Sequence, residues 1–128
     1  MISTQIKAAC QILSKNGLVG IPTETVYGLA ANAMSELAVS KIFELKKRPS
    51  YNPLIVHISH IDDLEKYTQN IPEKAYQLAR TFWPGPLTLV LEKKPVIPDL
   101  ITAGKNTVGI RMPNHPVTLS LLKQLDFP

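Results

Sequence analysis

Apolar residues recur every three or four positions in four segments, the spacing that places them on one face of a helix. Residues 3–15 form the first such segment, which Asn16-Gly17 is expected to end. Three further helices are predicted to begin at Ser35, Pro72 and Pro116, and Pro49 is expected to end the helix that Ser35 caps. The apolar faces of these three helices are expected to hold Ala38, Ile42 and Leu45; Ala75, Leu78, Ala79 and Phe82; and Val117, Leu121, Leu122 and Leu125.

Strands are predicted in the segments between these helices. The apolar run 18–21 is typical of a buried strand, and residues 54–58 are a second candidate for one; the acidic pair that follows marks a helix start. Residues 87–92 and 107–112 alternate in the way of strands with one buried face. Because helices and strands interleave, the pattern predicts an α/β fold with a mixed sheet.

Composition narrows the class of protein. The chain has 128 residues, of which 45% are hydrophobic and 19% charged, so we expect one folded domain over residues 1–128 and no disordered tail. Its single cysteine, Cys10, excludes an internal disulfide and is expected to be a small buried apolar residue. No apolar run reaches the roughly 18 residues that span a membrane. We therefore predict a soluble, cytoplasmic protein with no membrane partner.

The net charge of +4 is mostly spread along the chain, with one dense cluster. Lys41, Lys46, Lys47 and Arg48 lie close together in sequence, with only Glu44 against them. Cations at the end of a helix are favoured by its dipole, so a solvated helix end explains the cluster by itself. A lysine and an arginine two positions apart, followed by a stiff proline, would also suit a polyphosphate or nucleic acid.

Three other segments carry candidate chemistry. The segment from Pro22 to Leu29 follows a buried strand and groups hydroxyls, a carboxylate and a phenol, which fits either a ligand loop or a turn that caps the next segment. His57 ends an apolar run, where a histidine is more often a satisfied core residue than a ligand. Arg111 lies on the same strand face as Thr107 and needs a carboxylate from the protein or from a substrate.

Several other kinds of site are not indicated. The three histidines lack the spacing of metal ligands, and no cysteine pair accompanies them, so no metal site is predicted. The phosphate-loop and dinucleotide fingerprints are also absent. A Ser-His-Asp arrangement stays open, although nothing in the sequence points to it. A nucleotide site would therefore have to bind its ligand through residues other than those of the two fingerprints.

Taken together and in order, the motifs resemble those of the YrdC-like family, the threonylcarbamoyl-AMP synthases. The resemblance covers nearly the whole chain. The matching segments are G-L-V-x-x-P-T-E-T-V-Y-G-L from Gly17, K-x-R-P from Lys46, N-P-L-x-V-H from Asn52, W-P-G-P-L-T from Trp83 and T-V-G-I-R-M-P-N-H-P from Thr107.

The resemblance implies a twisted mixed sheet with flanking helices and a nucleotidyltransferase activity. Such enzymes make L-threonylcarbamoyladenylate and pyrophosphate from L-threonine, bicarbonate and ATP, and the product feeds the threonylcarbamoyladenosine modification of tRNA. Magnesium is expected with ATP, and double-stranded RNA or tRNA and the downstream transfer proteins are expected partners. The residues implied for L-threonine are Thr25, His57 and Arg111; those for ATP are Lys46, Arg48, Asn52 and Thr107, of which Lys46 and Arg48 face the phosphates as the catalytic pair.

The family pattern continues beyond residue 128, into a Ser-x-Asn motif that completes the nucleotide site. Ser50-Tyr51-Asn52 has the same letters but belongs to the K-x-R-P loop. We therefore expect a YrdC-like domain that lacks its C-terminal part. Two alternatives stay open: a non-catalytic module that binds double-stranded RNA or tRNA, and a carbamoylation enzyme like the related domain of hydrogenase maturation proteins.

Overall fold

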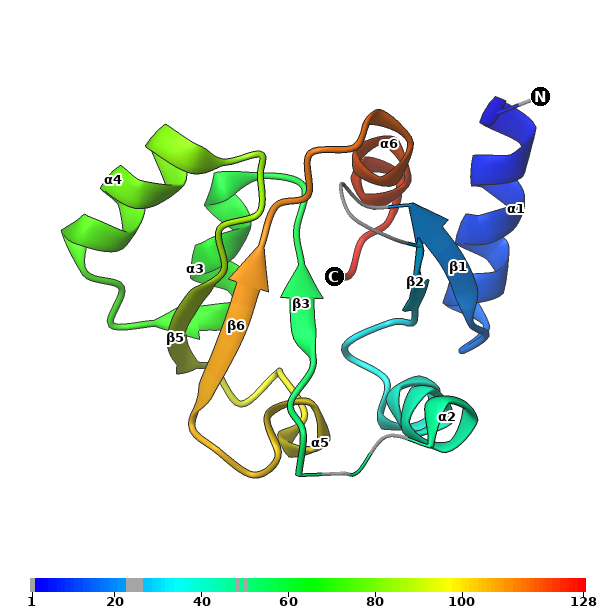
Figure 1. Ribbon diagram of the computed structural model, residues 1–128, viewed down its shortest axis with the longest axis horizontal. Helices are drawn as coiled ribbons and strands as arrows, with labels where there is room; N and C mark the ends of the chain where they lie inside the picture. Colours follow the sequence, from blue (N-terminus) through cyan, green and yellow to red (C-terminus); the bar gives the residue numbers. More distant parts are fainter. Residues whose placement is uncertain (1, 23–26, 48, 50) are drawn as a thin grey trace.

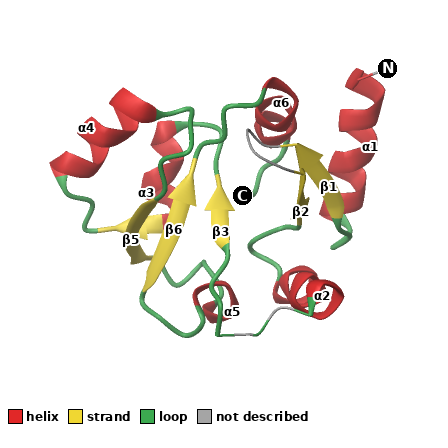
Figure 2. Ribbon diagram, viewed as in Figure 1, coloured by secondary structure: helices red, strands yellow, loops and turns green. Residues whose placement is uncertain are grey.

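The computed structural model describes residues 2–22, 27–47, 49 and 51–128 as an α/β arrangement of two sheets and surrounding helices (Figures 1 and 2). None of the helices in these ranges is long and apolar enough to cross a membrane. The elements are α1 (Ile2–Ser14), β1 (Val19–Pro22), β2 (Tyr27–Ala30), α2 (Glu36–Lys46), β3 (Ile55–His57), the 3-10 helix η1 (Ile61–Asp63), α3 (Leu64–Tyr67), β4 (Thr68–Gln69), α4 (Glu73–Phe82), β5 (Leu89–Lys93), α5 (Asp99–Thr102), β6 (Thr107–Arg111) and α6 (Pro116–Gln124).

The larger sheet has four strands in the order β3-β6-β5-β4. Strand β3 is parallel to β6, whereas the β6–β5 and β5–β4 pairs are antiparallel. The predicted mixed sheet is therefore confirmed. Strands β1 and β2 form a separate antiparallel hairpin beside β3 (Figure 1).

The main core lies on one face of the four-stranded sheet. Val108 and Ile110 of β6 are buried there, as the alternation of this strand predicts. They pack in one cluster with Leu64 of α3 and Ala79 of α4, and Figure 1 shows these two helices gathered beside β5 and β6. Burying this face leaves the opposite face of β6, which carries Thr107, Gly109 and Arg111, outside the core.

A second, smaller core joins the hairpin to α1 and α6. Its buried residues are Ile6 and Leu13 of α1, Ile21 of β1 and Leu121 of α6. Cys10 packs at the edge of this core and is half-buried, and this partial burial raises the pKa of its thiol. The cysteine is therefore less reactive as a nucleophile than an exposed one, since the thiolate is the attacking form.

The ends of α2 differ in how closely they follow the sequence pattern. The Ser35 hydroxyl accepts a hydrogen bond from the Ala38 N–H at 3.2 Å, which confirms the predicted cap. The helix ends at Lys46, before Pro49, because Lys47 adopts a left-handed conformation with φ of 52°. The prediction that Leu45 lies on the apolar face is wrong, since this side chain is 67% exposed.

Three elements were not predicted. Strand β2 occupies the second half of the segment that the sequence indicated as a loop, because Tyr27–Ala30 pair with β1 across the hairpin. The short elements β4 and α5 have too few residues to show a period of their own. Phe82 is also misplaced by the helical pattern: it is 54% exposed at the last position of α4, where the helix leaves the core.

Candidate functional site

The end of β3 and the end of β6 bring two of the predicted residues together. His57 and Arg111 are direct partners in the parallel register of these strands, so their side chains leave the same face of the sheet. That face lies opposite the main core. The sequence predicted both residues for L-threonine, and no sequence spacing could show that they would be neighbours, because 54 positions separate them.

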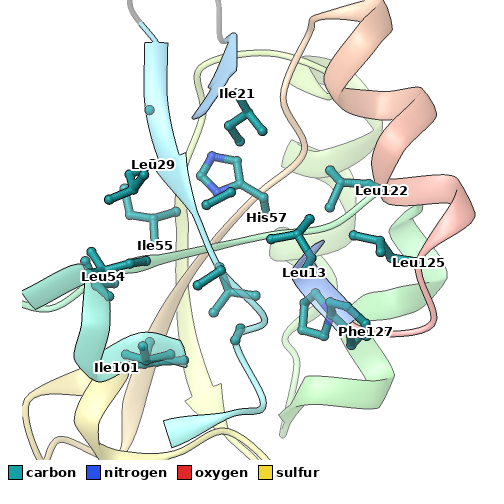
Figure 3. A pocket seen from close by; sticks show the side chains of 18 of the residues that line it. Leu13, Ile21, Leu29, Leu54, Ile55, His57, Ile101, Leu122, Leu125 and Phe127 are labelled. Atoms are coloured by element: carbon teal, nitrogen blue, oxygen red, sulfur yellow. The ribbon is translucent and has the colours of Figure 1, made fainter. Parts of the chain in front are cut away.

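His57 also lines a cavity between β3 and the hairpin. The cavity has a volume of about 310 Å³, and most of its lining is apolar, including Leu13, Ile21, Leu29 and Ile55. Figure 3 shows the imidazole of His57 among these side chains. Pro128 lies at the same cavity, and its carbonyl accepts a hydrogen bond from Ala33 N–H at 3.0 Å.

The environment of His57 differs from that of a satisfied core histidine. Its buried Nε2 atom has no hydrogen-bond partner among the residues that the structure describes. Burial lowers the pKa of His57 below its ordinary value of 6.5, because removal from water disfavours the imidazolium, and a backbone hydrogen bond at Ile55 opposes this effect. A neutral imidazole with an unused nitrogen is suited to a ligand hydroxyl or N–H.

This lowered pKa predicts a loss of stability in mild acid. Between the lowered pKa and 6.5, the unfolded chain binds more protons at His57 than the folded chain, so the free energy of unfolding falls as the pH falls through that window. We expect His57→Gln to flatten this part of the dependence, as measured by urea denaturation at about pH 7.5 and about pH 5.5. A variant that keeps the full wild-type slope would contradict the assignment.

Arg111 is held at its Nε atom. The Nε–H donates a hydrogen bond to the Gly85 carbonyl at 3.0 Å, and the residue is half-buried at the end of β6. Its pairing with His57 therefore places a guanidinium beside a neutral imidazole. A guanidinium in a fixed orientation is the group best suited to bind a carboxylate with two parallel hydrogen bonds.

The described residues that were predicted for ATP come from three segments of the chain. Lys46 is the exposed last residue of α2 and lines the same cavity as His57. Asn52 lies in the turn before β3, where its N–H donates to the Pro49 carbonyl at 3.0 Å. Thr107 begins β6, four residues before Arg111 on the same strand face, which corresponds to about 13 Å along a strand. Thr25 and Arg48 fall outside the described residues.

The basic cluster is smaller than its sequence indicates. Lys41 is half-buried, and its ammonium donates a hydrogen bond to the Asn16 carbonyl at 2.8 Å. This contact ties α2 to the end of α1, so Lys41 has a structural role. Lys46 and Lys47 are the exposed cations of the cluster among the described residues. No group of three or more His, Cys, Asp or Glu side chains in the described ranges is arranged to hold a metal ion.

Comparison with known proteins identifies the family. The family model described as "Telomere recombination", that of Sua5, YciO and YrdC, matches residues 11–128. The chain belongs to the Sua5/YciO/YrdC family. The "Threonylcarbamoyl-AMP synthase" of Bacillus subtilis is 53% identical to this family member over 97% of the chain and 36% of the relative's length.

Two solved structures show the same fold. The structure of Pyrococcus abyssi Sua5 complexed with L-threonine is 52% identical, with a TM-score of 0.92 over 94% of this chain and 35% of that one. Full-length HypF in a phosphate- and nucleotide-bound form is 26% identical, with a TM-score of 0.81 over 96% of this chain and 19% of that one. This Sua5/YciO/YrdC family member spans about a third of the length of the first curated relatives that it matches.

Sequence reasoning assigned no role to Gly85 or to the apolar wall of the cavity. The sequence analysis used the segment around Gly85 only as the W-P-G-P-L-T motif, and the contact of Gly85 with Arg111 arises only from the folded path of the chain. The cavity wall combines residues of α1, β2, β3 and α6. Each of them has the pattern of an ordinary core residue, so only the folded arrangement identifies them.

Proposed function

We propose that this chain carries the L-threonine site and part of the nucleotide site of a threonylcarbamoyl-AMP synthase, a nucleotidyltransferase that acts in tRNA threonylcarbamoyladenosine modification. The observation that carries the proposal is the pairing of Arg111 with His57, which lines a cavity that Lys46 also lines. It offers a fixed cation for a carboxylate, an unused imidazole nitrogen for a hydroxyl, and a second cation nearby. The relatives named for this activity support it.

The reaction joins two anions. The carbamate of L-threonine, formed with bicarbonate, attacks the α-phosphorus of ATP; a carbamate oxygen–phosphorus bond forms, and the bond to the pyrophosphate oxygen breaks. We assign the threonine carboxylate to Arg111 and its hydroxyl to His57 and Thr25. Cations near the phosphates reduce the repulsion between the reactants and stabilise the charge that develops on the leaving pyrophosphate.

We assign Lys46 and Arg48 to the phosphates, and Asn52 and Thr107 to the rest of the nucleotide. The separation of Thr107 from Arg111 along β6 gives this face the length for two substrates placed end to end. Because the described residues offer no acidic cluster for a metal, a Mg²⁺ ion that arrives with ATP would be held through the phosphates.

The test is pyrophosphate release from Mg·ATP, with L-threonine and bicarbonate each omitted in turn. We expect release only when both are present, and a decrease of about 100-fold in Lys46→Ala, since loss of one donor to developing charge has effects of this size. Lys74→Ala is the matched control, because Lys74 is exposed on α4, away from the cavity. Release that ignores L-threonine would contradict the proposal.

The same samples separate the two alternatives. Turnover with carbamoyl phosphate and no response to L-threonine would favour a carbamoylation enzyme of the HypF kind. RNA binding that weakens with salt and ignores ATP and L-threonine, without pyrophosphate release, would favour an RNA-binding module.

A further inference from the structure

The turn between α4 and β5 is tied to itself and to the end of β6. The indole of Trp83 is buried, and its Nε1–H donates a hydrogen bond to the Leu87 carbonyl at 2.7 Å, which closes the turn. The Gly85 N–H donates to the Met112 carbonyl at 2.9 Å. The turn is therefore fixed to the residue that follows Arg111.

Gly85 is the point at which this turn cannot hold a larger residue. A Cβ atom at this position would lie 2.5 Å from the Phe82 carbonyl oxygen, which is a backbone atom at the end of α4. A side chain here would force the turn to shift, because the end of a packed helix cannot move cheaply. The glycine therefore allows the close passage of the turn over the helix end.

The third contact of the turn reaches the candidate site. The Gly85 carbonyl accepts the hydrogen bond from Arg111 Nε at 3.0 Å, so the residue that is fixed to Met112 through its N–H also binds Arg111 through its C=O. A guanidinium is planar, and a hydrogen bond at Nε together with the side-chain stem sets the direction of its two terminal nitrogens.

We propose that the turn from Trp83 to Leu87 is a positioning device that orients the Arg111 guanidinium toward the carboxylate of the bound amino acid, with Trp83 and Gly85 as its positioning residues. The identity of the ligand rests on the proposed function. The geometry of the device does not, because all three hydrogen bonds belong to this chain.

The first experiment measures the device without any ligand. In the wild type, the Arg111 Nε–H resonance, assigned by its absence in Arg111→Lys, is expected to be shifted from the free-arginine position and protected from solvent exchange. Gly85→Ala is expected to return this resonance to the free-arginine position. Gly20→Ala is the matched control, since Gly20 is exposed and an added Cβ meets nothing within 4 Å. An unchanged Arg111 resonance in Gly85→Ala overturns the proposal.

The second experiment compares L-threonine with L-threoninamide, which lacks the carboxylate. Gly85→Ala is expected to weaken L-threonine binding at least tenfold and to leave threoninamide binding unchanged. Equal weakening of both ligands would indicate a general structural defect and overturn the positioning role. If the wild type binds neither ligand, the proposed function fails. The Arg111 Nε–H resonance in the wild type and in Gly85→Ala still tests whether the turn holds the guanidinium, because that measurement needs no ligand. Trp83→Phe, which removes the indole donor but keeps an aromatic ring, provides the same comparison should Gly85→Ala fail to fold.

Discussion

Replacing Arg111 with alanine is expected to weaken L-threonine binding roughly 10- to 100-fold, because a hydrogen-bonded contact between two charged groups contributes about 1.5–3 kcal/mol. The guanidinium is half-buried and held at Nε by the Gly85 carbonyl, so it meets the ligand with little loss of side-chain freedom. Arg111→Lys keeps the charge but loses the two parallel donors, and we expect an intermediate affinity. Isothermal titration calorimetry gives the dissociation constants.

The matched control for this experiment is Arg80→Ala. Arg80 is exposed on α4 and forms a surface ion pair with Glu73 at 3.0 Å. Such pairs contribute little, so this variant should bind L-threonine as the wild type does. If Arg111→Ala also binds with wild-type affinity while remaining folded, the carboxylate does not lie at Arg111, and the assignment of this face fails.

The largest effect on stability is expected from Ile110→Ala. Ile110 is fully buried in β6, between β3 and β5, and its loss leaves a cavity in the main core. Such substitutions reduce the free energy of unfolding by about 2–5 kcal/mol. Urea denaturation of the variant measures this change, and a lower thermal midpoint should accompany it.

Val90→Ala is the control for Ile110→Ala. Val90 belongs to the neighbouring strand β5, but its side chain is 67% exposed on the other face of the sheet. We expect its free energy of unfolding to stay within about 0.5 kcal/mol of the wild type. Equal losses in the two variants would contradict the assignment of the buried and open faces of the sheet, on which the placement of Arg111 depends.

The sequence predicts a structural feature most reliably where that feature depends only on neighbouring residues of the chain. The alternation along 107–112 assigns Val108 and Ile110 to the core and Arg111 to the open face, since a strand has only two faces. The cap of α2 at Ser35 is equally local, because it depends on one hydroxyl and one nearby N–H. The order of the motifs also identified the family.

Features that depend on contacts between distant segments are not contained in such patterns. Leu45 follows the helical spacing but faces solvent, because the buried stripe of α2 runs through Val39 and Phe43, and the helix ends at Lys46, the residue after Leu45. Strand β2 exists through its pairing with β1, and no signal within its four residues distinguishes it from a loop. The contact between Gly85 and Arg111 likewise joins a turn to the end of a strand across 26 positions.

The most direct test of the central claim is a titration of the isotope-labelled chain with L-threonine, followed by the backbone amide resonances. We expect saturable shifts at the ends of β3 and β6, around His57 and Arg111, and unchanged resonances on the exposed surface of α4. Saturable shifts confined to another part of the chain, or no shifts at high L-threonine concentration, would contradict the placement of the amino-acid site on this face.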